Sequence, residues 1–421
     1  MSLFSIITKL MKANVMFAVL GLSISVIVAR ELGPLLKGEL TLFLLVSSIF
    51  SLSMRFGLDT SIIRYLKIKR EGFSLVKNSI YLSLMIISLV FLFVYIITQF
   101  FYYSDDFFFN KYDYYYLLYI LIPLEVISII IASYLLGSNM VNKYALSIIC
   151  QPIVVLFFIL SLLIFEIDLT VLNIITITVF SFFIKIIYLI FVTKNLFHLT
   201  ENYNFSKSLN LLRFGIKSHI GNVIDFFIIR TDILLISFFI GLEAAGIYSI
   251  AALAEKMNII NGTIGSAVFA KIRGREDFKL VNKIIRLTIP LLLIIVLLAT
   301  IFSKYFLLII FGDSFKEAAQ PFIILILGFS ILFISKPMKA YLVIIDKPIL
   351  LTYSSTSALV INVFLNLILI PEYGIVGAAA ATTVANIVYV IVVLFFYKKN
   401  TKVSFKDIFL FKNTDFKEVL Q

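Results

Sequence analysis

Long runs of apolar residues follow one another along the whole chain, separated by short turns that contain charged residues, glycine or proline. Each run has about the length of roughly 20 residues that a helix needs to cross the hydrocarbon core of a bilayer. In lipid, helices satisfy their own backbone hydrogen bonds, and runs of this length indicate helices. The pattern therefore predicts an all-α polytopic membrane protein with about twelve membrane-spanning helices, over residues 10–29, 39–58, 79–102, 114–137, 146–165, 169–193, 217–240, 245–270, 284–306, 319–340, 350–370 and 376–397.

The composition agrees with this fold class and narrows the chemistry. Of the 421 residues, 61% are hydrophobic and 14% are charged, whereas soluble domains carry roughly 25% charged residues. The one cysteine, Cys150, excludes an intramolecular disulfide. The two histidines, His198 and His219, are too few for a histidine-based metal centre, so we expect no metal site.

The basic residues are distributed unequally between the two sides of the membrane. Most of the 36 Lys and Arg lie before the first span, in the even-numbered loops or in the tail. The odd-numbered loops contain Arg30, Lys37, Lys111, Lys304 and Lys316. Because cytoplasmic loops carry the excess of Lys and Arg, both termini are predicted to be cytoplasmic. Topology thus explains the net charge of +12 without a nucleic-acid partner.

A weak internal repeat relates the two halves of the sequence. Sliding the chain against itself by about half its length pairs Asn14 with Asn222 and Gly38 with Gly246. An even number of spans in each repeat makes the halves parallel, and the substrate path of such carriers lies between them. We therefore predict two parallel six-helix bundles that work by alternating access, with the N-terminal bundle at residues 1–200, a cytoplasmic linker at 201–216, the C-terminal bundle at 217–397 and a cytoplasmic tail at 398–421.

The predicted span 217–240 carries an acidic stripe. Asp225 and Asp232 follow helical spacing and share one face, whereas Arg230 points away from both at 100° per residue. Arg230 is expected to pair with Glu125 or Glu255 of a neighbouring helix unless the span is distorted. Each in-membrane acid can hold helices together or couple transport to H+ or Na+. The acids with these two open roles are Glu125, Asp225, Asp232 and Glu255.

Cations outnumber anions in and beside the spans, and this surplus predicts a cavity for an anionic group such as a diphosphate. The planar fork of arginine matches phosphate oxygens best. The alternative is that the long side chains snorkel to the headgroups. The cations selected by this argument are Arg55, Lys185, Arg230, Lys256, Lys336 and Lys339. The sequence has no G-x-x-x-x-G-K-[ST] loop for nucleotide phosphates, and we expect no cofactor.

Four segments resemble the polysaccharide flippases of the multidrug/oligosaccharidyl-lipid/polysaccharide exporter superfamily, especially the Wzx-type O-antigen carriers. They occur in the family's order and are spread over the whole chain. The segments are ARELGPLLKGEL (29–40), FGLDTSIIRYLK (56–67), TDILLISFFIGLEAAGIYSIAALAEK (231–256) and PEYGIVGAAAATTVAN (371–386). The resemblance implies a V-shaped, two-bundle carrier in the bacterial inner membrane.

The resemblance also implies a substrate and partners. Such carriers move an undecaprenyl-diphosphate-linked oligosaccharide from the cytoplasmic to the outer leaflet, for O-antigen or capsule assembly. A cationic cavity between the bundles receives the diphosphate and the sugars, which adds Arg30 and Arg64 to the candidate residues because they match the family's motif arginines. Arg230 and Asp232 are carried over in the same way. The implied partners are membrane lipids, a polysaccharide polymerase and the chain-length machinery.

Two other functions remain alternatives at this point. A cation-coupled small-molecule exporter of the same superfamily would need an acid-lined apolar pocket. A membrane-embedded glycosyltransferase or ligase would need a large outer loop with catalytic carboxylates, and the predicted outer loops are short. We therefore expect a transporter without catalytic residues.

Overall fold

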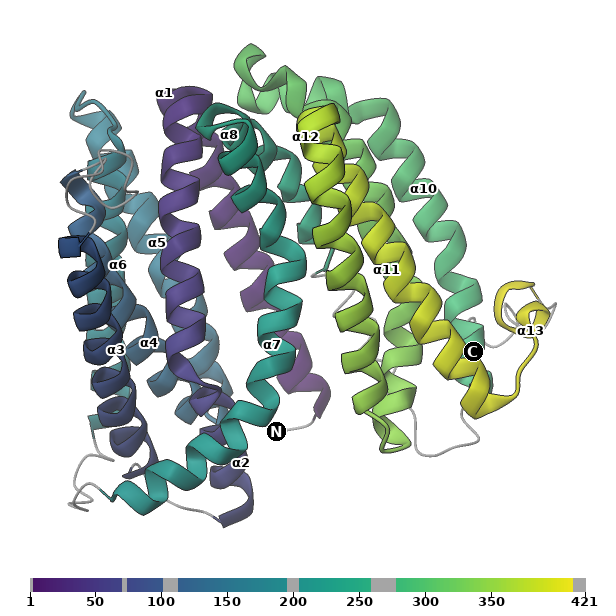
Figure 1. Cartoon of the computed structure of the whole chain (residues 1–421), viewed down its shortest axis with the longest axis horizontal. Coiled ribbons are helices and arrows are strands. Elements are labelled where there is room, and N and C mark those ends of the chain that lie inside the picture. The colour runs from purple at the N-terminus through teal and green to yellow at the C-terminus, as the bar shows by residue number, and fades with distance from the viewer. Residues whose placement is uncertain (1–2, 70–73, 101–112, 195–203, 259–277, 412–421) are drawn as a thin grey trace. The chain divides into compact units, whose positions relative to one another are not determined.

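The structure is a computed structural model, and it describes residues 3–69, 74–100, 113–194, 204–258 and 278–411 (Figure 1). Every regular element within these ranges is a helix, which confirms the predicted all-α membrane fold. The α-helices of the first half are α1 (Leu3–Arg55), α2 (Leu58–Lys69), α3 (Ser74–Phe100), α4 (Leu118–Gly137), α5 (Val141–Ile164) and α6 (Val171–Thr193). Those of the second half are α7 (Phe205–Phe239), α8 (Leu242–Ala251), α10 (Phe278–Phe311), α11 (Ala319–Ile344), α12 (Ile349–Thr401) and α13 (Phe405–Phe409). Short 3-10 helices are η1 (Asp113–Leu117), η3 (Ala252–Lys256) and η5 (Asp313–Ala318).

Eight of the described helices are long and apolar enough to cross a membrane. Two of them, α1 and α12, each contain two predicted spans joined at a glycine with positive φ, Gly33 (φ 71°) and Gly374 (φ 60°). Glycine adopts this backbone conformation without steric cost. A kink at the glycine, and not a loop, therefore joins the two spans of each pair. These helices agree with the predicted number of about twelve spans when α1 and α12 are each counted as two spans and α7 and α8 are added. The predicted span 245–270 is described only as far as Asn258.

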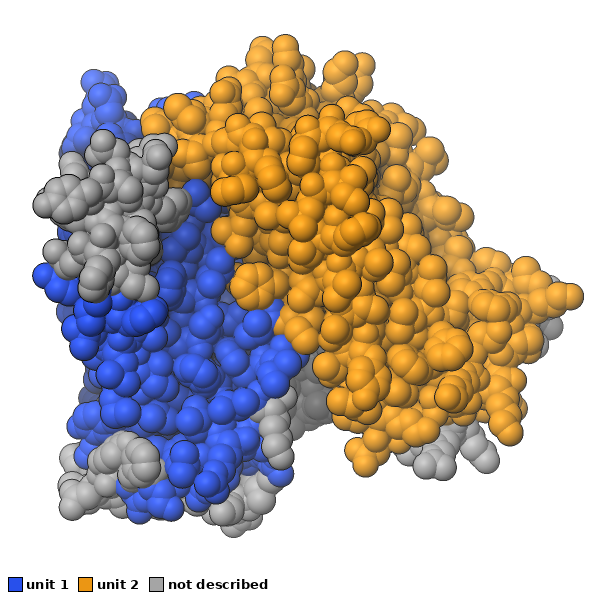
Figure 2. Space-filling view, in the orientation of Figure 1, with its two compact units in different colours: residues 1–32, 40–223 blue, residues 33–39, 224–421 orange. Residues whose placement is uncertain are grey.

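The chain forms two compact units, which Figure 2 shows in different colours. Unit 1 contains residues Met1–Leu32 and Leu40–Val223, and unit 2 contains Gly33–Glu39 and Ile224–Gln421. The boundary between the units lies inside α7, after Val223. The predicted linker, residues 201–216, belongs to α7 from Phe205 onward. Within unit 2, a Cβ added to Gly38 of α1 would lie 1.7 Å from the carbonyl oxygen of Leu242. Position 38 must therefore be glycine for this part of α1 to lie against α8.

The core of unit 1 is built around α4. Its fully buried residues Leu121, Val126, Ile130 and Leu135 point in different directions around the helix, and α4 packs against α2, α3, α5 and α6. The first part of α7 also belongs to this unit, because Ser61 Oγ of α2 donates a hydrogen bond of 2.7 Å to the Leu211 carbonyl. Unit 1 therefore holds the N-terminal end of the helix that carries the predicted acidic stripe.

The core of unit 2 is built around α11, which packs against α10 and α12 (Figure 1). The small residues Gly377, Ala378, Ala379 and Ala381 of α12 are buried, as expected for a face that lets helices approach closely. Thr383 Oγ1 donates a hydrogen bond of 2.7 Å to the Ile324 carbonyl of α11. This close packing fixes how α11 and α12 present their polar residues to the second part of α7.

Candidate functional site

The acidic stripe of α7 is directed toward α12. Asp225 Oδ1 accepts a hydrogen bond of 2.9 Å from Ser355 Oγ, and Asp232 Oδ2 accepts one of 2.7 Å from Thr382 Oγ1. The two donors lie in different halves of α12, before and after the kink at Gly374. The predicted alignment of Asp225 and Asp232 on one face of the helix is therefore confirmed.

Asp232 lies at the centre of a buried network of neutral side chains. Only 2% of Asp232 is exposed, and its carboxylate accepts a second hydrogen bond of 2.5 Å from the Tyr248 hydroxyl of α8. Asn366 Nδ2 donates to Asp232 Oδ1 at 3.4 Å and to Asn362 Oδ1 at 3.1 Å. Asn362 in turn donates to Thr382 Oγ1 at 3.0 Å. The network joins α7, α8 and both halves of α12 around one carboxylate.

The oxygen atoms of this network have the chemistry of a small-cation site. Carboxylate, amide carbonyl and hydroxyl oxygens are hard ligands, which suit cations such as Na+. The Oδ1 atom of Asn366 is buried without a hydrogen-bond partner. No cluster of three or more His, Cys, Asp or Glu side chains that could hold a metal ion occurs among the described residues. The network thus offers one charged ligand and several neutral ones.

Arg230 lies on a different face of α7 and pairs with Glu255. Its Nη2 atom is 3.2 Å from Glu255 Oε1, and the side chains of Arg230 and Glu255 are 33% and 15% exposed. Glu255 is one of the two partners that the sequence predicts for Arg230. Lys256 Nζ approaches the same carboxylate oxygen at 3.7 Å from a more exposed side chain. Arg230 therefore joins α7 to η3.

The Arg230–Glu255 pair is expected to stabilise unit 2 more than the Lys256–Glu255 pair does. A double-mutant cycle with Arg230→Gln and Glu255→Gln should give a coupling energy of about 1–2 kcal/mol, within the range for residues in direct contact. The matched cycle with Lys256→Gln should give less than about 1 kcal/mol, because an exposed pair is screened by solvent. Equal coupling energies in thermal unfolding of the purified protein would contradict this assignment.

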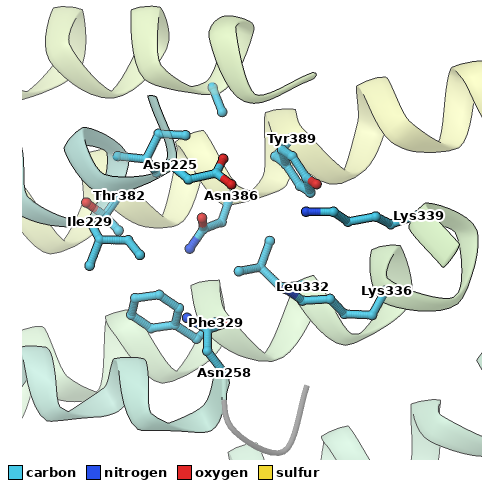
Figure 3. A pocket seen from close by; sticks show the side chains of 12 residues that line it. Asp225, Ile229, Asn258, Phe329, Leu332, Lys336, Lys339, Thr382, Asn386 and Tyr389 are labelled. Carbon is cyan, nitrogen blue, oxygen red and sulfur yellow. The ribbon is translucent and has the colours of Figure 1, made fainter. Parts of the chain in front are cut away.

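A cavity of about 280 Å³ lies in unit 2, between α7, α11 and α12 (Figure 3). Three charged side chains line it: Asp225 of α7 and Lys336 and Lys339 of α11. The other lining residues are Ile228, Ile229, Asn258, Phe329, Leu332, Ala358, Thr382, Asn386 and Tyr389. Asp225 thus uses one carboxylate oxygen to bond Ser355 and also borders the cavity.

The cavity brings together residues that the sequence places in separate spans, and it adds some that the sequence did not single out. Asp225, Lys336 and Lys339 were candidates, whereas Asn386 and Tyr389 were not. Thr382, Asn386 and Tyr389 recur at spacings of four and three, which places them on one helical face. That polar face, directly after a run of small residues, is the signal that could have identified them.

A second group of predicted residues meets within unit 1. Glu125 of α4 faces Ser47 and Ser51 of α1, and Arg55 and Lys185 are near enough to act on its charge. Arg55 also pairs with an acid that the sequence analysis did not select, because its Nη1 atom is 3.3 Å from Asp59 Oδ2. Arg55 and Lys185 therefore share the acid Glu125 as an electrostatic neighbour within unit 1.

The two arginines selected by resemblance are both exposed. Arg30 is exposed on α1. Arg64 is exposed on α2, where its guanidinium lies 4.0 Å from the centre of the Phe214 ring. Neither residue lines the cavity of unit 2, and the same holds for Arg230 and Lys256.

Comparison with known protein families identifies the chain. A family model described as "Polysaccharide biosynthesis protein" matches residues 7–272, which is more than half of the sequence. The chain belongs to this family. No sequence among the curated proteins matches this chain. The match includes the predicted flippase motifs at residues 29–40, 56–67 and 231–256.

Solved structures share the fold of this chain at low sequence identity. The lipid II flippase MurJ in an inward closed conformation is 17% identical with a TM-score of 0.70, over 98% of this chain and 95% of that chain. An inward-facing multidrug resistance MATE family transporter of the MOP superfamily is 14% identical with a TM-score of 0.72, over 94% and 98%. A point mutant of the Vibrio cholerae MATE transporter VcmN is 14% identical with a TM-score of 0.64, over 96% and 97%. The chain therefore shares its fold with MurJ and with MATE transporters of the MOP superfamily, the superfamily that the sequence motifs resemble.

Proposed function

We propose that this protein is a flippase that moves undecaprenyl-diphosphate-linked oligosaccharide repeat units from the inner to the outer leaflet of the bacterial cytoplasmic membrane, for O-antigen or capsule assembly. The observation that carries the proposal is membership of the polysaccharide biosynthesis family in a chain built of membrane-spanning helices. A protein of this kind must hold a polar glycan within the membrane. The cavity of unit 2 is lined by hydroxyl, amide and charged groups together with apolar side chains.

The structural likeness to the lipid II flippase MurJ supports a lipid-linked glycan as the substrate class. A glycan on a lipid carrier crosses the membrane only if its polar part is shielded from hydrocarbon, because unsatisfied polar groups there cost several kcal/mol each. The proposal takes both termini as cytoplasmic and the polymerase and chain-length machinery as partners on the outer side. On this proposal the protein is a transporter and not an enzyme.

A cation-coupled multidrug-type exporter is the second candidate, and the likeness to MATE transporters favours it. The charges of the cavity argue against it. Lys336 and Lys339 outnumber Asp225 among the lining residues, so the lining repels the organic cations that such an exporter would carry. The cavity is better suited to a neutral or anionic glycan.

The energy source is proposed to be an H+ or Na+ gradient acting through Asp232. Four in-membrane acids were candidates for coupling, and their surroundings distinguish them. Glu255 is paired with Arg230, Glu125 faces Arg55 and Lys185, and Asp225 borders the cavity together with Lys336 and Lys339. The side chains that donate to Asp232 are all neutral, so its negative charge is available to bind a proton or a sodium ion.

Deleting the gene in its host tests the proposed function. The lipid-linked repeat unit is expected to accumulate on the inner leaflet, and surface polysaccharide is expected to disappear. The measurement is extraction and mass analysis of undecaprenyl-linked glycans together with a surface polysaccharide assay. Expression of the wild-type chain should restore both. Normal surface polysaccharide in a deletion strain without a second flippase gene, or efflux of small cations by the purified protein, would contradict the proposal.

A further inference from the structure

The cavity of unit 2 has room for one sugar ring. Its volume of about 280 Å³ lies just below the range of roughly 300–1,000 Å³ for sites that take drug-sized ligands. An oligosaccharide repeat unit with its diphosphate is larger than such a ligand. The cavity therefore selects a part of the substrate rather than the whole of it.

The charges that line the cavity suit a single negative charge. Lys336 lies within electrostatic range of both Lys339 and Asp225, and the three side chains together leave one positive charge uncompensated. A carboxylate neutralises that charge. A diphosphate diester carries two negative charges, which would leave an excess and place phosphate oxygens near Asp225.

The chemical types of the lining residues also favour a sugar over a diphosphate. Among the described residues that line the cavity there is no arginine, the side chain whose planar fork matches phosphate oxygens. Asn258 and Asn386 can donate hydrogen bonds to sugar hydroxyls and accept them. The hydroxyl hydrogen of Thr382 is already donated to Asp232. Asp225 is held by Ser355 through one oxygen, and its second oxygen is suited to accept from a hydroxyl.

Aromatic and charged side chains reach into the cavity from different helices, which gives it distinct sides. Figure 3 shows Asp225 from α7, Asn386 and Tyr389 from α12, and Lys339 from α11 around the same space. The ring of Phe329, also from α11, lies at the opposite wall from Asp225 in this view. An aromatic wall binds the apolar face of a sugar ring, while the polar groups bind its edge.

We infer that this cavity binds one sugar ring that carries a carboxylate group, a uronate-type unit, with Phe329 against the ring, Asp225 and Asn386 on its hydroxyls, and Lys336 and Lys339 on its carboxylate. The inference rests on the proposed function for the origin of the sugar, which is the glycan of the lipid-linked substrate. It goes further by naming the chemical class of that sugar and by placing the diphosphate outside this cavity.

Binding to the purified full-length protein in lipid nanodiscs tests the inference directly. The probes are D-glucuronate, D-glucose and inorganic pyrophosphate, and the measurement is saturation-transfer NMR of the sugar protons during titration. We expect D-glucuronate to bind at least about tenfold more tightly than D-glucose, and pyrophosphate not to displace it. Equal affinity for the two sugars, or displacement of D-glucuronate by pyrophosphate, would overturn the inference.

Variants separate the roles of the lining residues. Lys339→Gln and Lys336→Gln should each reduce the preference for D-glucuronate over D-glucose. Phe329→Leu should weaken both sugars to a similar degree. Lys316→Gln, which removes an exposed lysine of η5 outside the cavity, is the matched control and should bind like the wild type. A Lys336→Gln/Lys339→Gln double variant that folds and keeps the full preference for D-glucuronate over D-glucose would show that the cavity is not the site.

A translocation assay distinguishes failure of this inference from failure of the proposed function. Proteoliposomes are loaded with undecaprenyl-diphosphate-linked glycans that either contain or lack a uronate unit. Translocation of both at equal rates would overturn the uronate specificity and leave the flippase function standing. Binding of D-glucuronate without translocation of either glycan would support the site and overturn the flippase function.

Discussion

Asp232→Asn is expected to reduce transport at least about tenfold and to remove its dependence on an ion gradient. The carboxylate is almost fully buried and accepts hydrogen bonds from Tyr248, Thr382 and Asn366. The amide of asparagine has the same shape as the carboxylate but only one acceptor oxygen. Its NH2 group would therefore face a donor that has lost its acceptor. Hydrogen bonds to a charged group contribute about 1.5–3 kcal/mol each, and a tenfold change corresponds to about 1.4 kcal/mol.

The loss of gradient dependence follows from the neutral surroundings of Asp232. A neutral amide neither takes up a proton nor supplies the charge that holds a sodium ion. The measurement is translocation of the lipid-linked glycan in proteoliposomes with an imposed H+ or Na+ gradient and without one. Asp313→Asn, which neutralises an exposed acid of η5, is the matched control and should retain both the rate and the gradient dependence. Gradient stimulation that persists in a folded Asp232→Asn protein would assign the carboxylate to helix packing alone.

Gly215→Ala is expected to lower the free energy of unfolding by about 1–3 kcal/mol, the usual cost of overpacking. In unit 1 the start of α7 crosses the turn before α2, where the backbones of Gly215 and Gly57 touch. A Cβ added to Gly215 would lie 2.5 Å from the Phe56 carbonyl oxygen and 2.9 Å from the Gly57 carbonyl carbon. Both contacts are backbone atoms, which cannot move away as the end of a flexible side chain can.

Gly221→Ala provides the matched control in the same helix. A Cβ at Gly221 would have no atom within 4 Å, and alanine favours a helix over glycine by about 1 kcal/mol. The unfolding temperature of this variant should equal or exceed that of the wild type, whereas that of Gly215→Ala should fall. Equal stability of the two variants in detergent would contradict the close crossing of α7 and the α2 turn.

Properties that depend on one helix at a time could be predicted from the sequence. Run length and hydropathy predicted the spans, and the kinks at Gly33 and Gly374 lie between the predicted members of each pair. Helical periodicity separated Arg230 from Asp225 and Asp232, because 100° per residue fixes the direction of each side chain on its own helix. These predictions needed no knowledge of which helices are neighbours.

Relations between helices could not be predicted in the same way. Periodicity left Glu125 and Glu255 as equal partners for Arg230, and only the packing of η3 beside α7 selected Glu255. The candidate cations were treated as one surplus, whereas the structure places Arg55 and Lys185 near Glu125 in unit 1 and Lys336 and Lys339 at the cavity of unit 2. A charge surplus counts residues but contains no information on which of them share a site.

The sequence by itself determined the fold class, the number of spans, the family motifs and the face of α7 on which each charge lies. Only the tertiary structure decided that Asp232 is surrounded by neutral donors and that Asp225 borders a cavity with two lysines. The physical reason is distance along the chain. Hydropathy and helical spacing act within one span, whereas the hydrogen bond from Thr382 to Asp232 joins residues 150 positions apart and exists only because α12 packs against α7.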